Sequence, residues 1–202
     1  MTTGLDARVE PLGNVLDRAK ESLGLLGSFR EKRRWKKIVE KINERIRAMT
    51  GGSAILRDDR RGEPVCHLKI ARPEMFEALK AFAGTKGSFR QLAGIREEGS
   101  WYLPVDFAEP FGVEGAGDGE TLPVGSAVRL RDELVALNKF LRVEESFALK
   151  NMVDFMDAGE AEIAKFEKRL NADGDFWLKF GFVTLKKLAD RSVEHRYPIV
   201  FD

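Results

Sequence analysis

The chain has 202 residues, of which 43% are hydrophobic and 33% charged, and 34 basic residues against 33 acidic ones leave a net charge of +1. A chain with this length and apolar content can bury a substantial core, which excludes a disordered protein. The near-neutral total also argues against a protein whose whole surface grips nucleic acid, although it says nothing of a local patch.

Two features of composition bear on metal binding and on location. One cysteine and two histidines supply too few ligands for an ordinary structural zinc site, so we expect no metal and no cofactor. Residues 1–6 lack the basic and then apolar order of a signal peptide, and charges interrupt every apolar run before it reaches the length of a bilayer span. These features predict a soluble, cytoplasmic protein without a membrane span.

Residues 1–52 carry apolar side chains at alternating spacings of three and four, which predict two helices. The first covers 12–26. The second begins at Ser28, whose spacing to Glu31 is that of a capping box, and it ends at Gly51. We interpret this part as a helical hairpin, or as one long helix kinked at the intervening glycines.

Residues 53–107 predict a small mixed sheet with one helix. Strand-like segments at 54–56 and 65–71 flank a polar turn, which is typical of a β-hairpin, and a helix from Pro73 to Gly84 follows. Residues 88–95 fit a strand or a helix equally well.

The last part of this region, 101–107, alternates apolar residues with Tyr102, Pro104 and Asp106, which predicts a half-buried strand. Because proline lacks the backbone N–H of a central strand, Pro104 indicates an edge or a bend.

The chain changes character between Arg96 and Arg129, where it has seven acidic residues and no basic one. Within this stretch, residues 108–124 are rich in glycine and lack apolar periodicity, so we expect an acidic mobile linker. The two halves of the chain also differ in charge. Residues 1–100 hold 21 basic and 14 acidic residues, whereas residues 101–202 hold 13 basic and 19 acidic residues.

Residues 125–202 predict a cluster of four helices and a terminal strand. The helices are expected at 126–141 with Ser126 as N-cap, at 146–157, at 160–170, and from Asp175 to about Asp190. A lone strand at 197–201 cannot satisfy its own hydrogen bonds, so we expect it to pair with the sheet of the middle region. The fold class is therefore α+β and mainly helical, and the parts form one integrated domain.

The single cysteine, Cys66, is a weak candidate for catalysis. It shares strand parity with Leu68, which favours a buried core thiol, and the adjacent His67 points to the opposite face. A dyad of Cys66 with His195 stays open as a hypothesis, because the terminal strand could bring the two together.

The strongest local signal is a basic helix at 30–47, which holds nine basic and three acidic residues. At 100° per residue one flank of its apolar seam carries the candidate partner- or anion-binding residues Arg30, Arg34, Lys37, Lys41 and Arg45. Such a stripe could engage nucleic-acid phosphate, anionic lipid or an acidic protein surface. The alternative is a solvated face or one docked on the acidic half of the same chain, and Trp35 belongs to the core by its spacing.

The chemistry-bearing motifs that we sought, for phosphate loops, nucleophile elbows, zinc proteases and calcium loops, are not in the sequence. The catalytic residues are therefore unknown, and we favour a non-catalytic protein–protein interaction or regulatory module that binds another protein or itself. Two alternatives stay open: an enzyme or small-molecule binder with an unrecognised pocket, and nucleic-acid or anionic-surface binding through the basic helix.

Overall fold

The computed structural model describes residues 5–21, 25–52, 56, 61–70, 74–96, 99–115, 121–144 and 175–201. These residues form a six-stranded mixed sheet and six helices, which confirms the mainly helical α+β fold. The strands are β1 (Leu5–Val9), β2 (Cys66–Ile70), β3 (Trp101–Leu103), β4 (Phe111–Glu114), β5 (Thr121–Ser126) and β6 (Ile199–Phe201). The helices are α1 (Leu12–Glu21), α2 (Leu25–Thr50), α3 (Glu74–Gly84), α4 (Arg90–Ala93), α5 (Ala127–Leu141) and α8 (Phe176–His195).

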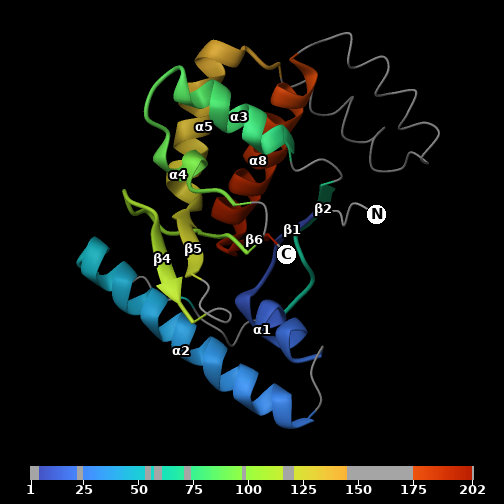
Figure 1. Ribbon diagram of the computed structural model, residues 1–202, viewed down its shortest axis with the longest axis vertical. Coiled ribbons are helices and arrows are strands. Elements are labelled where there is room, and N and C mark those ends of the chain that lie inside the picture. Colours follow the sequence, from blue (N-terminus) through green and yellow to red (C-terminus); the bar gives the residue numbers. More distant parts are fainter. Residues whose placement is uncertain are drawn as a thin grey trace, which may run out of the picture.

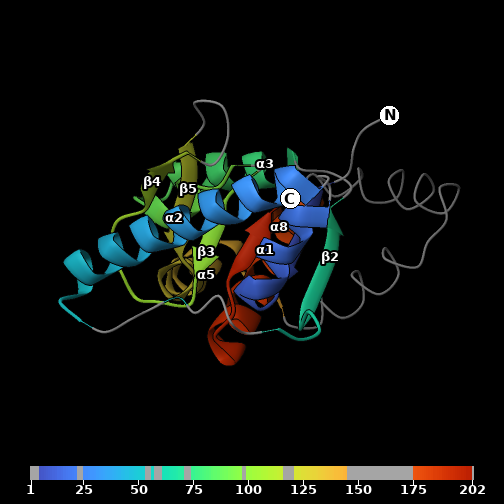
Figure 2. The ribbon, with the colours of Figure 1, turned by 90° about the horizontal axis from the view of Figure 1, so that it is seen from below.

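The sheet has the strand order β2-β1-β6-β3-β5-β4 and lies between two helical layers (Figure 1). One layer holds α1 and α2, and the other holds α3, α5 and α8. The two faces of β6 separate the layers, because Val200 packs with the α1 and α2 side whereas Ile199 and Phe201 pack with the other side. Seen from below, α2 lies across the strands (Figure 2).

The terminal strand β6 pairs antiparallel with β1 and with β3, through Val9↔Ile199 and Trp101↔Val200. The prediction that it joins the middle sheet is confirmed. This pairing ties the first strand of the chain to the last.

Of the β-hairpin predicted from 54–56 and 65–71, residues 54, 55 and 71 lie outside the described residues. The antiparallel partner of β2 is β1, with Val9 opposite Cys66. The sequence pattern did not predict a strand at β1. Leu56 lies outside the sheet because the Asn43 side chain of α2 satisfies its backbone: the Leu56 amide donates to Asn43 Oδ1 at 2.7 Å, and Asn43 Nδ2 donates to the Leu56 carbonyl at 3.3 Å.

The strand predicted at 101–107 is shorter and more buried than expected. β3 ends at Leu103 and lies inside the sheet, so Pro104 marks a bend and not an edge. Tyr102, expected to face solvent, is only 2% exposed. Helices cover both faces of the sheet here, and alternation therefore does not separate buried from exposed positions.

The segment expected to be an acidic linker supplies two strands. β4 and β5 pair antiparallel with Gly112 opposite Pro123, and β5 continues in parallel beside β3. Glycine at position 112 of β4 leaves room for the Thr121 side chain of β5, since a Cβ at position 112 would lie 2.3 Å from Thr121 Cγ2. The expected chain boundary therefore lies within one continuous sheet.

The helices match their predicted positions more closely than the strands do. Ser126 caps α5 by accepting from the Arg129 amide at 3.1 Å, as expected, and residues 88–95 contain α4. α2 begins at Leu25, so Ser28 lies inside the helix and is not its cap. α8 starts after Asp175 and runs to His195, past the expected end. The helices expected at 146–157 and 160–170 lie outside the described residues.

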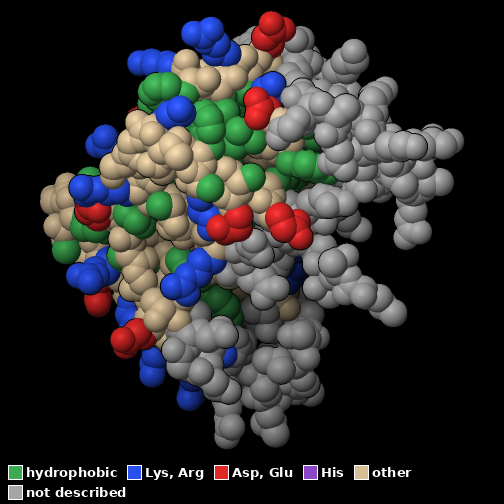
Figure 3. All heavy atoms as spheres, turned by 45° about the horizontal axis from the view of Figure 1, so that its top comes forward, with side chains coloured by type: hydrophobic (Ala, Val, Ile, Leu, Met, Phe, Trp, Pro, Cys, Tyr) green, Lys and Arg blue, Asp and Glu red, His purple; other side chains and the backbone are tan. Residues whose placement is uncertain are grey.

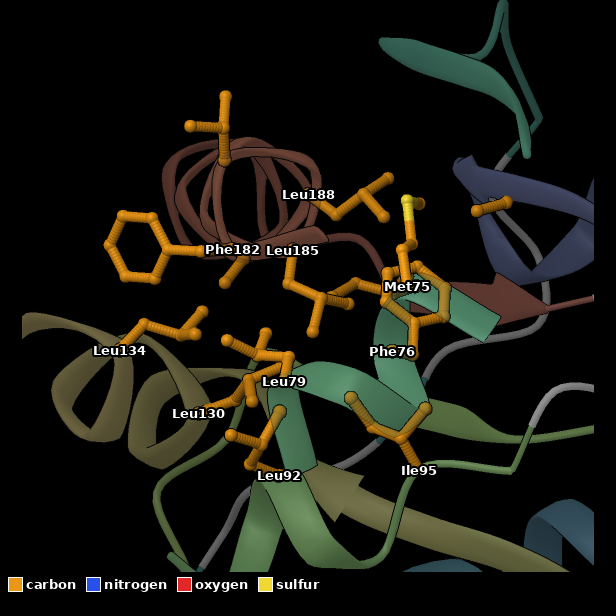
Figure 4. Packing of buried hydrophobic residues seen from close by; sticks show 14 of the residues in the cluster. Met75, Phe76, Leu79, Leu92, Ile95, Leu130, Leu134, Phe182, Leu185 and Leu188 are labelled. Carbon is orange, nitrogen blue, oxygen red and sulfur yellow. The ribbon is translucent and has the colours of Figure 1, made fainter. Parts of the chain in front are cut away.

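The core between the sheet and α3, α5 and α8 is built from aliphatic and aromatic side chains that meet from all three helices (Figure 4). Leu79, Leu130 and Leu185 are fully buried, and burial of each such side chain stabilises the fold by about 1.5–3 kcal/mol. α8 comes so close to α3 that a Cβ at Gly181 would lie 2.9 Å from the Met75 carbonyl oxygen. Among the described helices none is long and apolar enough to cross a membrane.

Candidate functional site

The β3–β4 connection, residues 104–110, is held in place by a buried polar network. The Gln91 side chain is fully buried: its Nε2 donates to the Ala108 carbonyl at 3.0 Å, and its Oε1 accepts from the Ser126 amide at 2.8 Å. The Tyr102 hydroxyl donates to the Gln91 carbonyl at 2.6 Å. One glutamine thus joins α4, the connection and the end of β5, and buried groups that are all satisfied in this way fix a loop firmly.

Glu133 of α5 completes the network from outside. Its two carboxylate oxygens accept from the Gln91 amide at 3.0 Å and the Leu92 amide at 2.9 Å, so it satisfies the free N–H groups at the start of α4. Burial raises the pKa of the Glu133 carboxyl, and the backbone hydrogen bonds oppose that rise.

The β3–β4 connection and β4 carry three acidic residues of the stretch that lacks basic residues. Asp106, Glu109 and Glu114 are exposed. Asp106 pairs with Arg129 of α5 at 2.5 Å, and Glu109 pairs with Arg90 of α4. On the face shown in Figure 3, acidic side chains lie among basic ones, so this part of the described surface has mixed charge.

The basic helix lies on the opposite layer and turns its charged side to solvent. Its apolar seam is buried, with Ile38, Ile42 and Ile46 at 2% exposure or less. Lys37, Lys41 and Arg45 are exposed.

One of the five predicted stripe residues, Arg34, is less exposed than expected. Arg34 is half-buried and its guanidinium lies 5.7 Å from the ring centroid of Trp35, which itself stacks on Trp101 at 5.2 Å. Trp35 therefore belongs to the core, as its spacing indicated, and Arg34 packs on it. The side chain of Arg30 lies outside the described residues.

A hydrogen bond joins the stripe to the acidic stretch. Lys41 Nζ donates to the Glu114 carbonyl at 3.1 Å, which joins α2 to the end of β4. Because the acceptor is a neutral carbonyl, the contact holds the helix in place without neutralising the lysine.

Cys66 and the two histidines form no catalytic arrangement in the described part of the chain. Burial raises the pKa of the Cys66 thiol, an effect only partly opposed by Lys187 and Arg191, so the reactive thiolate is disfavoured. His67 faces Asp6 at 3.4 Å, and His195 stacks on Tyr197 with centroids 6.4 Å apart. The buried thiol agrees with the expectation from strand parity. Within the described residues no cluster of three or more His, Cys, Asp or Glu could hold a metal.

Sequence reasoning missed the network around Gln91 and Glu133. These residues are 42 positions apart and match no local motif, so no spacing rule connects them. The one sequence signal that could have pointed to the network is Glu133, a carboxylate next to the apolar face of the helix predicted at 126–141.

Comparison with known proteins gives one finding. A family model described as "Putative DNA-mimic protein" matches residues 77–201, which span α3 to β6 and include the acidic stretch but not α2. The chain matches no curated protein and no solved structure.

Proposed function

The chain belongs to this DNA-mimic family, and from that premise we propose that it is a non-catalytic interaction module whose partner is a DNA-binding protein. Acidic side chains of the matched region would take the place of DNA phosphates in the partner's binding site. The charge of the region supports this reading: residues 77–201 contain 21 acidic and 17 basic residues, which leaves a net charge of −4 in a chain whose total is +1.

The observation that carries the proposal is the coincidence of the family match with the acidic stretch. Asp106, Glu109 and Glu114 lie in the matched region, are exposed, and sit on the β3–β4 connection and β4. The Gln91 network fixes the backbone of that connection, so the carboxylates are presented from a rigid support, which lowers the entropy cost of binding.

The ion pairs with Arg90 and Arg129 do not contradict this use. Both pairs are exposed at the surface, where such pairs contribute about 0–1 kcal/mol, so a partner rich in arginine and lysine can compete for the same carboxylates. Binding of this kind is expected to weaken as salt rises, because screening acts on every charge pair at the interface.

The test uses competition with DNA. Proteins of the source cell that bind a duplex-DNA column are passed over the immobilised full chain, and the column is then eluted with duplex DNA. We expect a retained protein that DNA displaces and whose own DNA binding, measured with the purified protein, is inhibited by the chain. A retained protein that binds the chain and DNA at the same time would contradict the proposal, as would a column that retains nothing.

Two triple variants link the result to the site. D106N/E109Q/E114Q removes three exposed carboxylates of the matched region, and we expect it to weaken binding of the retained protein at least tenfold. E40Q/E44Q/E63Q removes three exposed carboxylates outside that region and is the control with the same change in charge. Equal affinities of the two variants would show that the acidic stretch is not the binding surface.

A further inference from the structure

The orientation of α2 is fixed by its buried side, which determines what its other side can do. Ile38, Val39, Ile42 and Ile46 pack in the cluster beneath the sheet, and Asn43 is held by its two hydrogen bonds to Leu56. These contacts fix the rotation of α2 about its own axis. The side opposite the buried residues therefore faces solvent over residues 38–46.

That outward side forms a basic face, which we define as the exposed basic residues of α2. It comprises Arg33, Lys36, Lys37, Lys41, Arg45 and Arg47, and only Glu40 and Glu44 oppose it among the exposed charged residues of the same segment. At 1.5 Å per residue these cations extend over about 21 Å of helix. A row of this length is rigid because the helix is fixed to the sheet.

The charges of this face are not compensated by the rest of the described chain. Within the described residues no carboxylate lies in ion-pair distance of Lys37, Lys41 or Arg45, and the Lys41 ammonium donates only to a carbonyl. The face thus carries a net positive potential toward solvent, outside the region that matches the family.

The chemistry of the face selects among anionic partners. A protein partner normally needs apolar or aromatic anchors, and Met49 in the last turn is the one large hydrophobic side chain among the described residues of α2 that is exposed. A lipid surface needs the apolar seam for insertion, and that seam is already buried. A second copy would offer the exposed carboxylates of Asp106 and Glu109, and the sedimentation experiment below tests that occupant.

Phosphates need only cations in a row, and phosphate contacts supply the sequence-independent part of nucleic-acid binding. We propose that the basic face of α2 binds the phosphate backbone of duplex DNA without sequence preference. This inference does not depend on the proposed function, because the two use opposite charges on different elements.

The test measures binding of the full chain to a labelled duplex of arbitrary sequence by fluorescence anisotropy over a salt series. If three or four phosphates are neutralised, the logarithm of the association constant should fall with the logarithm of salt concentration at a slope of about −2.7 to −3.6. A duplex of scrambled sequence should bind equally well. Undetectable binding at low salt, or binding that salt does not change, would overturn the proposal.

Matched variants locate the contact. K37A/K41A/R45A removes three cations of the basic face and keeps good helix formers, so we expect at least a twentyfold loss of affinity and a shallower salt slope. K139A/K187A/R191A removes three exposed cations from α5 and α8 with the same change in net charge, and it should bind like the wild type. Equal losses in the two variants would mean that total charge alone matters and would overturn the assignment to α2.

The alternative occupant is tested with the same proteins by sedimentation velocity at low salt. Self-association of the wild type that disappears in K37A/K41A/R45A, together with no binding to DNA, would assign the face to a second copy and overturn the proposal. Circular dichroism of both variants checks that the helices are intact. The acidic triple variant D106N/E109Q/E114Q should keep full DNA affinity, which separates failure of this inference from failure of the proposed function.

Discussion

At the scale of single residues, the most informative group is Glu133, because burial and hydrogen bonding act on its pKa in opposite directions. Its side chain is half-buried, and its carboxylate accepts hydrogen bonds from two backbone amides of α4. Burial raises its pKa above the ordinary value, so the folded protein holds this proton at a higher pH than the unfolded chain does. The stability of the protein must therefore depend on the protonation of this group.

The sign of that dependence gives a prediction for Glu133→Gln. Between the unfolded and the folded pKa the folded state binds more protons, so the stabilising contribution of Glu133 is complete below the unfolded pKa and decreases as pH rises through the folded pKa. At acidic pH the protonated carboxyl keeps acceptor capacity on both oxygens, whereas glutamine places an NH2 group, which only donates, against one of the two α4 amides. We therefore expect the variant to lose about 1–3 kcal/mol at acidic pH, because that amide is left without a partner.

Urea denaturation at several acidic and neutral pH values checks this. The difference in free energy of unfolding between wild type and E133Q should be largest at the acidic end and shrink as pH rises. Asp132→Asn, a change at an exposed neighbour, should show no such trend. A difference that grows with pH would contradict the assignment.

At the scale of elements, helices were predictable because their signal is local. The spacing of Leu130, Leu134 and Leu137 predicts α5 and its buried side without knowledge of the rest of the chain. The strands depend on distant partners: β1 pairs with β2 and with β6, which lie far away in the sequence, so neither its existence nor the pairing of β2 could be derived from local pattern.

The candidate surfaces, too, were predictable only where the signal is local in the sequence. The exposure of Lys37, Lys41 and Arg45 followed from helical periodicity, because the apolar seam fixes which side faces the sheet. The position of Arg34 did not, because it depends on Trp35 and on the stacking of Trp35 with Trp101 from another element. The Gln91 network likewise joins residues that only the complete fold brings together.

The contact of α3 with α8 gives a prediction that runs against local propensity. Alanine favours a helix over glycine by about 0.8–1.0 kcal/mol, yet we expect Gly181→Ala to destabilise the protein by about 1–3 kcal/mol. A Cβ at this position would lie 2.9 Å from the Met75 carbonyl oxygen, so α3 and α8 would have to separate. Thermal and urea denaturation measure the change, with Gly84→Ala as control, since a Cβ there meets nothing within 4 Å. A more stable G181A protein would contradict the close contact.

At the scale of the whole molecule, the sheet makes the first and last parts of the chain depend on each other. β6 lies between β1 and β3, and its two faces contribute to both hydrophobic clusters. The acidic region matched by the family and the basic helix outside it are therefore attached to one sheet, although they carry opposite charge. A ligand bound to either surface stabilises the fold that supports the other, because binding to the native state alone shifts the folding equilibrium.

This arrangement predicts that the chain unfolds as one cooperative unit. Ile42→Ala in the cluster on the α2 side and Leu185→Ala in the cluster on the α8 side should each cost about 2–5 kcal/mol, and each should lower the unfolding midpoint of both layers equally. Hydrogen exchange followed by mass spectrometry in a urea series compares peptides from α2 with peptides from α8. If I42A released the α2 peptides while the α8 peptides kept their protection, the two layers would be separate folding units. A shared midpoint in both variants would instead mean that the pairing of β6 with β1 and β3 transmits the loss from one face of the sheet to the other.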